Sequence, residues 1–296
     1  MSKPTIGFIG LGLMGSAMVE CLQANGYPLV VIANRSRTAI DAAIARGATE
    51  AKTAAELAQA SDIVMLCMDT SASVESRIYG DQGVLAGVRP GTVVIDFGTS
   101  VPDSTRKIGA DLAEKGVAYL DAPLGRTPAH AKDGLLNIMC AGDKAAFEKV
   151  KPELDVLGEN VFHLGDLGAG HTVKLINNFF AMTTACAMSE AFVMADRAGI
   201  DRETLYGVMS AGPLHSGMMD FVRSFAVDGE IALAFSMDNA AKDVGYYSRM
   251  AEDLGAPSRM AGCAAAALKA AQDAGCGGRM VPEMVDFMAD SYQKAD

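Results

Sequence analysis

The chain has 296 residues, of which 50% are hydrophobic and 21% are charged, so it can bury a substantial core and lacks the composition of a disordered protein. Its 36 acidic residues outnumber its 25 basic ones and give a formal net charge of −11. Such a surface repels phosphate backbones and anionic membranes, so we expect neither a nucleic acid nor a membrane as a partner.

The six cysteines never form a Cys-x-x-Cys pair and show no metal-ligand spacing with the four histidines. We therefore expect free thiols in a reducing compartment and no metal site. A strand pattern begins within the first few residues, without the charged and apolar regions of a leader, and the apolar stretch 178–195 is interrupted by polar residues. These features predict a cytoplasmic protein.

The first half of the chain alternates short apolar runs with helical patterns. Strands are expected at 5–9, 29–33, 63–68, 93–96, 118–121 and 135–141. Helices are expected at 14–25, 38–46, 54–59, 73–79, 103–115 and 144–157. Runs such as 63–68 are nearly all apolar, as in a parallel sheet that helices cover on both faces. This alternation predicts an α/β fold with a doubly wound parallel sheet of the Rossmann type in residues 1–164.

The second half is rich in alanine and methionine and has helical periodicity with few strand signals. A long helix is expected at 171–199, closed by Gly199, and further helices at 202–210, 217–225, 238–254, 258–274 and 280–291. The glycine-rich stretch 164–170 marks the boundary. Residues 165–296 are therefore predicted to form an all-helical C-terminal domain.

A dinucleotide-binding motif follows the first strand and opens the first helix. It reads Gly10, Leu11, Gly12, Leu13, Met14, Gly15. The first glycine permits a tight turn, the second lets the backbone approach a pyrophosphate, and the third allows close helix–strand packing. The N-terminus of the helix then offers free N–H groups to the phosphates. These residues are predicted to bind a dinucleotide.

The end of the second strand indicates which dinucleotide is bound. A carboxylate there would bond the ribose hydroxyls of NAD, but this chain has Asn34, Arg35 and Ser36. A guanidinium at this place can form charge-assisted bonds with a 2′-phosphate. We therefore predict that NADP is preferred over NAD, the alternative being that Arg35 is a solvated surface residue.

A lysine at the start of the long helix is the candidate proton donor. The run 168–178 reads Gly-Ala-Gly-His-Thr-Val-Lys-Leu-Ile-Asn-Asn, so Lys174 and Asn178 lie one turn apart on one helix face. Desolvation among apolar residues disfavours the ammonium form of a lysine, which helps it to deliver a proton to a carbonyl oxygen. Asn178 could hydrogen-bond the substrate or hold the amine in place.

Three motifs of the chain occur in a characteristic order and spacing. They are the N-terminal Gly-Leu-Gly-Leu-Met-Gly, the Asp-Ala-Pro segment at 121–123 and the Gly-Ala-Gly-x-x-x-Lys-x-x-x-Asn run at 168–178. In this arrangement the chain resembles the β-hydroxyacid dehydrogenase family, which includes the 3-hydroxyisobutyrate dehydrogenases. The resemblance covers essentially the whole chain, including Lys242 and Asp243.

The resemblance implies a Rossmann domain, a long interdomain helix and an all-helical C-terminal domain, with the active site in the cleft between domains. It implies that Lys174 is the catalytic acid/base, that Asn178 acts beside it as a substrate ligand, and that Asn177 contacts the substrate. It places Lys242 near the cofactor or the substrate. Homodimers or homotetramers are usual in this family.

The predicted substrate loop departs from the family pattern. The family commonly has Asp-Ala-Pro-Val-Ser-Gly-Gly, whereas this chain continues from Pro123 through Leu124 to Gly125, Arg126 and Thr127. This variant is similar to the loop of sulfolactaldehyde reductases. A guanidinium beside a hydroxyl suits a carboxylate or sulfonate, so these residues are predicted to bind an anionic substrate. The alternative is that Arg126 pairs with a nearby acid and shapes the loop.

The resemblance also suggests roles for other residues, and one position differs from a related enzyme family. Met65, Leu66 and Thr99 are expected to contact the cofactor, and Cys67 is expected to be a packing residue. His171 is expected to be a satisfied histidine at the helix start. The related decarboxylating 6-phosphogluconate dehydrogenases have a glutamate where this chain has Ala181, so simple hydride transfer without loss of CO2 is expected.

The function predicted from the sequence is therefore the NAD(P)-dependent, reversible reduction of a small anionic aldehyde to the corresponding hydroxy acid. The aldehyde would be a semialdehyde acid or a compound like sulfolactaldehyde. Alternatives are a 3-hydroxyisobutyrate or 4-hydroxybutyrate dehydrogenase, an imine reductase, and a dinucleotide-binding module without turnover. The imine reductases tend to replace the catalytic lysine, which disfavours that alternative.

Overall fold

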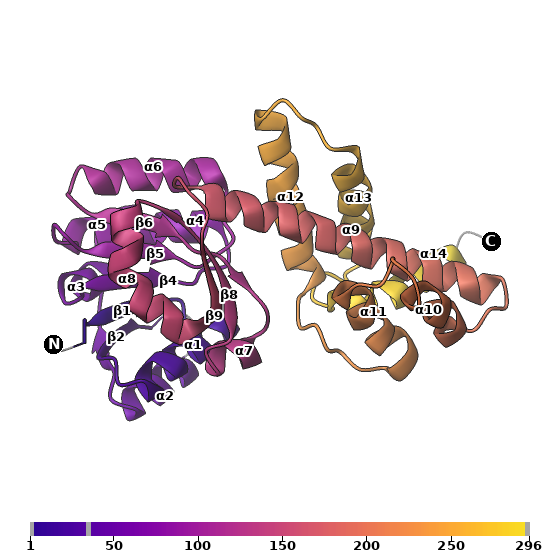
Figure 1. The fold of residues 1–296 in the computed structure, drawn as a ribbon, viewed down its shortest axis with the longest axis horizontal. Coiled ribbons are helices and arrows are strands. Elements are labelled where there is room, and N and C mark those ends of the chain that lie inside the picture. The colour runs from indigo at the N-terminus through magenta and orange to yellow at the C-terminus, as the bar shows by residue number, and fades with distance from the viewer. Residues whose placement is uncertain (1–2, 34–36, 294–296) are drawn as a thin grey trace. The chain divides into compact units, whose positions relative to one another are not determined.

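The computed structural model of the protein describes residues 3–33 and 37–293 (Figure 1). Two compact units are distinguished within the chain, one ending at Lys174 and the other beginning at Leu175. The helix α9 (Ala169–Arg197) begins in the first unit and continues in the second. In the part of the chain that the structure describes, no helix has the length and apolar character needed to span a membrane.

The first unit is built on one sheet. Its strands are β1 (Ile6–Ile9), β2 (Leu29–Ile32), β3 (Thr49–Ala51), β4 (Ile63–Leu66), β5 (Val93–Asp96), β6 (Ala118–Asp121), β7 (Leu124–Gly125), β8 (Leu136–Gly142) and β9 (Gly158–His163). They lie in the order β3-β2-β1-β4-β5-β6-β8-β7, with β9 beside β8. All pairs from β3 to β6 are parallel, which confirms the predicted fold class.

The far edge of the sheet is mixed rather than parallel. β8 is antiparallel to both β6 and β7, and it is parallel to β9. The connection from β7 to β8 holds only the five-residue helix α7 (Pro128–Lys132). A parallel crossover needs about a dozen residues or more, so this short connection reverses the chain direction.

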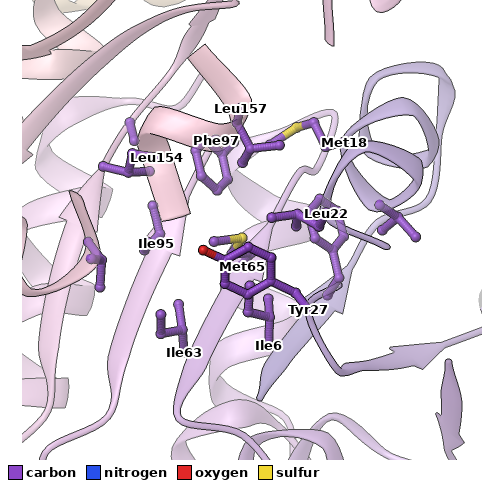
Figure 2. Packing of buried hydrophobic residues seen from close by; sticks show 14 of the residues in the cluster. Ile6, Met18, Leu22, Tyr27, Ile63, Met65, Ile95, Phe97, Leu154 and Leu157 are labelled. Carbon is purple, nitrogen blue, oxygen red and sulfur yellow. The ribbon is translucent and has the colours of Figure 1, made fainter. Parts of the chain in front are cut away.

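Helices cover both faces of the sheet (Figure 1). One face carries α7 with α1 (Leu13–Ala24), α2 (Thr38–Ala45) and α8 (Lys144–Leu157). The other carries α3 (Ala54–Gln59), α4 (Ser71–Tyr79), α5 (Val84–Gly87) and α6 (Pro102–Ala113). Because successive strand side chains point to opposite faces, Phe8 packs in the first core and Ile9 in the second. Figure 2 shows the first core, where Met18 and Leu22 of α1 and Leu154 of α8 lie around strand residues.

The second unit is built from helices, with one isolated β-bridge between Ser236 and Met280 in its described part. After α9 come α10 (Arg202–Ser210), α11 (Gly217–Asp228), α12 (Met237–Asp253), α13 (Arg259–Asp273), a short 3-10 helix (Val281–Glu283) and α14 (Met284–Gln293). The helices α10 to α13 each begin after a residue whose side chain accepts a backbone N–H of the first turn; these caps are Asp201, Ser216, Ser236 and Ser258. Methionine and alanine side chains dominate the core between them.

The longer expected helices are present, but five shorter elements were not predicted from the sequence pattern. β3, β7, β9, α5 and α7 were not expected. β3 has only three residues, none of them buried, so it carries no apolar run. Pairing with β2 rather than its own composition makes it a strand.

A buried carboxyl group lies in the first unit. Burial raises the pKa of Glu153 on α8 above its usual range. The hydroxyl of Tyr27 donates a hydrogen bond to this carboxyl, and burial followed by the nearby Glu153 charge raises the pKa of Tyr27.

Candidate cofactor and active site

The glycine motif forms a tight turn between β1 and α1. Gly10 has a positive φ of 99°, and a Cβ there would lie 2.3 Å from the backbone oxygen of Cys67, at the end of β4. A Cβ on Gly15 would lie 2.0 Å from the backbone oxygen of Gly10. Both positions therefore require glycine for the fold of the turn itself.

Gly12 differs from the other two glycines. It is the N-cap of α1, and apart from its chain neighbours none of the described residues lies within 4 Å of the place that its Cβ would occupy. Gly12 supplies no side-chain cap to this helix end, and the first turn of α1 has no acidic residue. The open approach and the uncapped N–H groups fit a bound pyrophosphate, as the motif predicts.

This turn lies at the carboxyl ends of parallel strands. β1 has β2 on one side and β4 on the other, so the chain winds outward in both directions from this point. In open α/β sheets such a switch point is where ligands bind. Leu13, at the start of α1, is 77% exposed here, and Met14 beside it is half-buried.

Two of the expected cofactor contacts have side chains that belong to the core. Met65 and Leu66 lie on β4, are 0% exposed, and pack in the first and second core, respectively. Only their backbone could face a cofactor. Cys67 follows them and is half-buried; burial and the charge of Asp96 raise its pKa to about 12, which agrees with a packing role. Asn34, Arg35 and Ser36 lie outside the described residues.

Thr99 lies half-buried in the turn after β5. The buried carboxylate of Asp96 orders this turn, because it accepts hydrogen bonds from the Gly98 backbone N–H (2.8 Å) and the Ser100 hydroxyl (3.0 Å). The turn follows the strand beside β4, so it lies at the same edge of the sheet as the glycine motif.

In the predicted substrate loop, Arg126 follows β7 and has a φ of 77°, the one positive value among the described non-glycine residues. A non-glycine residue in this region costs about 1–3 kcal/mol, so other contacts must hold it there. Its guanidinium donates to the Leu135 carbonyl at 2.7 Å and pairs with the carboxylate of Glu159 on β9. A pairing with a nearby acid was the alternative weighed for this residue, and a substrate anion would meet Arg126 already bonded to a carboxylate.

The neighbours of Arg126 have local structural contacts. Gly125 lies opposite Asn137 of β8, where a Cβ would come within 3.2 Å of the Asn137 Cβ. Thr127 stands at the N-cap of α7, and its hydroxyl lies 2.7 Å from Nδ1 of His130. Pro123 is buried, and its carbonyl accepts the Met139 backbone N–H at 3.0 Å.

Lys174 lies half-buried in the second turn of α9, six residues after Gly168, whose φ is +94°. The carboxylate of Asp121, at the end of β6, accepts the backbone N–H groups of Gly168 (2.8 Å) and His171 (2.7 Å). A carboxylate at a helix N-terminus satisfies free N–H groups and interacts favourably with the helix dipole. The start of α9 is thus tied to the same edge of the sheet.

Asn178 lies one turn beyond Lys174 and is buried. Its amide nitrogen donates to the Asp243 carboxylate of α12 at 2.6 Å, and its amide oxygen accepts from exposed Asn177 at 3.2 Å. Lys242 Nζ lies 3.1 Å from the second oxygen of the same carboxylate. Asp243 thus holds two predicted site residues, although it was noted only as a family resemblance. Because Asp243 is 65 residues from Asn178 along the chain, no local sequence pattern could predict this contact.

The predicted site residues do not line an apolar groove that lies on the second unit. This groove has a volume of about 470 Å³, and its walls come from α9, α11, α13 and the segment 209–214. Among the described residues, no group of three or more histidine, cysteine or acidic side chains could hold a metal ion. In the described part of the chain, the predicted site residues lie on the glycine turn, on β4, on the turn after β5, around β7, and on α9 and α12.

Comparison with known proteins agrees with this geometry. Residues 5–165 match the family model of the NAD binding domain of 6-phosphogluconate dehydrogenase, and residues 168–288 match the model described as NAD-binding of NADP-dependent 3-hydroxyisobutyrate dehydrogenase. The chain is similar to 2-(hydroxymethyl)glutarate dehydrogenase of Eubacterium barkeri, with 34% identity covering 81% of this chain and 80% of the relative.

It is also similar to 3-sulfolactaldehyde reductase of Escherichia coli strain K12, with 30% identity covering 92% and 91% of the two chains. Its fold is similar to a structure of Mycobacterium tuberculosis 3-hydroxyisobutyrate dehydrogenase with L-serine, with a TM-score of 0.87 and 26% identity over 97% and 99% of the two chains.

Proposed function

The chain belongs to the β-hydroxyacid dehydrogenase family of NAD(P)-dependent oxidoreductases, and from this premise we propose that it reversibly reduces a small anionic aldehyde to the hydroxy acid, with Lys174 as the general acid/base. The aldehyde is a semialdehyde acid or a sulfolactaldehyde-like compound. The observation that carries the proposal is the placement of a half-buried lysine on a helix start that is tied to the cofactor edge of the sheet.

The residues at the sheet edge fit a nicotinamide dinucleotide. The turn from Gly10 to Gly15 would hold the pyrophosphate, since Gly12 leaves the approach open and α1 offers uncapped N–H groups. When bound, the nicotinamide supplies or accepts the hydride. Thr99 is proposed to contact the nicotinamide, and Lys242 is proposed as a further contact of the cofactor. Arg35 supports a preference for NADP over NAD, because its guanidinium suits a 2′-phosphate.

The chemistry proposed for the protein's own residues is a proton transfer. As the aldehyde carbon is reduced, Lys174 donates a proton to the carbonyl oxygen and so prevents an alkoxide from forming. In the reverse direction the same amine takes the hydroxyl proton. Asn178, held by Asp243, would orient the substrate or the amine.

A substrate anion is proposed to bind at the loop that holds Pro123, Gly125, Arg126 and Thr127, with Asn177 as a further contact. Arg126 and Thr127 supply N–H and O–H donors of the kind that carboxylates and sulfonates bind. The similarity to 3-sulfolactaldehyde reductase supports an acidic aldehyde as the substrate class.

The experiment is a comparison of the wild-type protein with Lys174→Met. Oxidation of NADPH and NADH is followed with succinic, methylmalonic and tartronic semialdehydes and sulfolactaldehyde, and coenzyme binding is measured by fluorescence. We expect kcat to fall by about 10²–10⁴-fold in the variant while coenzyme binding persists. Full turnover in a folded, coenzyme-binding variant would refute the role of Lys174, and a clear NADH preference would refute the cofactor proposal.

The same panel distinguishes the alternatives. A strong preference for methylmalonic or succinic semialdehyde would favour a 3-hydroxyisobutyrate or 4-hydroxybutyrate dehydrogenase. A wild-type protein that binds NADPH and reduces none of the aldehydes would favour a binding module without turnover.

The protein is further proposed to form a homodimer or homotetramer and to act in the cytoplasm. The apolar groove on the helical unit supports self-association, because it is lined by exposed side chains such as Phe180 and Met260, which are 69% and 56% exposed. All six cysteines are free, which supports a reducing compartment.

A further inference from the structure

His171 lies on the first turn of α9 and is completely buried. Its Nδ1 lies 2.7 Å from the hydroxyl oxygen of Thr105, on α6. That hydroxyl can donate to the Val101 carbonyl at 3.2 Å, and it then accepts the Nδ1 proton. The expected satisfied histidine is therefore only half satisfied, because Nε2 has no hydrogen-bond partner among the described residues.

The unpartnered Nε2 lies toward a buried carboxylate. It is 3.7 Å from Oδ2 of Asp96, while Nδ1 lies 3.8 Å from Oδ2 of Asp121. Both acids are 0% exposed, and the Tyr119 hydroxyl also approaches Asp96, at 3.4 Å. A histidine that only fills space needs no polar surroundings, whereas this ring contacts the Thr105 hydroxyl and lies beside two buried acids.

The two carboxylates order two different parts of the proposed site. Asp96 holds the turn that carries Thr99, through Gly98 and Ser100. Asp121 holds the first turn of α9, which precedes Lys174. The His171 ring lies beside both carboxylates.

The backbone at this place leaves little freedom to move. A Cβ on Gly170 would lie 2.3 Å from the Met139 carbonyl oxygen and 2.9 Å from that of Asp121, so the helix start is in close contact with the sheet. The first turn of α9 is therefore held closely against the sheet, and its position determines where Lys174, one turn further along the helix, lies.

We propose that His171 is a positioning residue: through Thr105 and the buried acids Asp96 and Asp121, it sets the first turn of α9, and hence Lys174, relative to the turn that carries Thr99. The inference rests on the proposed role of Lys174 as the acid/base. His171 does not exchange protons with the substrate; it sets where the amine lies.

The test uses three variants of the full-length protein. His171→Leu removes both ring nitrogens, whereas His171→Asn keeps an amide close to the place of Nδ1 and with it the Thr105 contact. Thr105→Val removes the hydroxyl from the other side with little change of volume. His163→Leu is the matched control, since it removes a different histidine contact in the same unit, from Nε2 to the Gly142 carbonyl.

We expect His171→Leu to lower kcat at least about tenfold, because a misplacement of about 1 Å reduces rates strongly. KM for NADPH and for the aldehyde should stay within about threefold, since neither the glycine turn nor the substrate loop is altered. His171→Asn should recover most of kcat, and His163→Leu should keep it. The double variant Thr105→Val with His171→Leu should lose no more than His171→Leu alone, because both changes remove the same contact.

A second readout does not depend on turnover. Hydrogen exchange of the segment 168–176 should be faster in His171→Leu than in the wild type and should return toward the wild-type rate in His171→Asn. If the wild type reduces no aldehyde, the proposed function fails, but hydrogen exchange still tests whether His171 holds the first turn of α9 in place. Unchanged kcat and exchange in His171→Leu, or equal losses in the leucine and asparagine variants, would overturn the inference. If His171→Leu does not fold, an unchanged kcat in Thr105→Val overturns it.

Discussion

Glu159 is predicted to lower the affinity of the protein for its acidic substrate. Its carboxylate pairs with Arg126, the residue proposed to bind the substrate anion. Replacing Glu159 by glutamine removes the competing charge and leaves the side-chain size unchanged. If the substrate must displace Glu159, the substitution should tighten binding of acidic aldehydes.

The size of the effect follows from the exposure of the pair. The Arg126 side chain is 30% exposed and that of Glu159 is 51% exposed, so water and salt screen the interaction. Pairs of this kind contribute about 0.2–1 kcal/mol. Glu159→Gln should therefore lower KM for an acidic aldehyde about 1.4- to 5-fold, and the gain should shrink at high ionic strength.

The assay measures initial rates of NADPH oxidation with an acidic and a neutral aldehyde of similar size. Arg126→Gly, which removes the cation and suits the positive φ, should raise KM for the acidic aldehyde and spare the neutral one. Asp155→Asn is the control, because it makes the same change in net charge at an acid that pairs with Lys151 instead. If KM for the acidic aldehyde is unchanged in both Glu159→Gln and Arg126→Gly, the ion pair only shapes the loop.

Three further predictions follow from the first unit. Gly12→Ala should weaken NADPH binding without lowering the melting temperature. Gly15→Ala should weaken binding and also lower the melting temperature, because only its Cβ would clash with the backbone. Equal decreases of the melting temperature in the two variants would contradict this. Glu153→Gln should melt above the wild type at neutral pH. Burial raises the pKa of Glu153 in the folded state, so the stability of the wild type falls as the pH rises through that pKa. The difference in melting temperature between Glu153→Gln and the wild type should therefore become smaller as the pH falls toward 4.5. Cys67, with its pKa raised by burial to about 12, should react with iodoacetamide far more slowly than exposed Cys263, as mass spectrometry of the labelled peptides would measure.

The architecture of the first unit was predictable because its signals are local. A run such as Ile63–Leu66 has apolar residues on both faces, which by itself indicates a strand covered on two sides. The glycine motif was assigned correctly to a strand–turn–helix context, since each glycine acts on its immediate neighbours. The mixed edge of the sheet was not foreseen, because β7 and β9 become strands only by pairing with β8.

Candidate site residues were less predictable wherever their role depends on distant partners. Met65 and Leu66 stand next to the cofactor edge in sequence, but the alternation of the strand turns their side chains into the two cores. Arg126 carries the charge that an anion site needs, yet its partner Glu159 comes from another strand. The Asn178–Asp243 hydrogen bond likewise joins two different helices.

The sequence by itself therefore determined the order of the elements, the dinucleotide motif and the lysine on the long helix, because periodicity and short motifs depend on neighbours along the chain. The tertiary structure alone decided which charges meet. It paired Arg126 with Glu159 and enclosed His171 between Asp96 and Asp121, since burial and ion pairing depend on distances in space that no local pattern records.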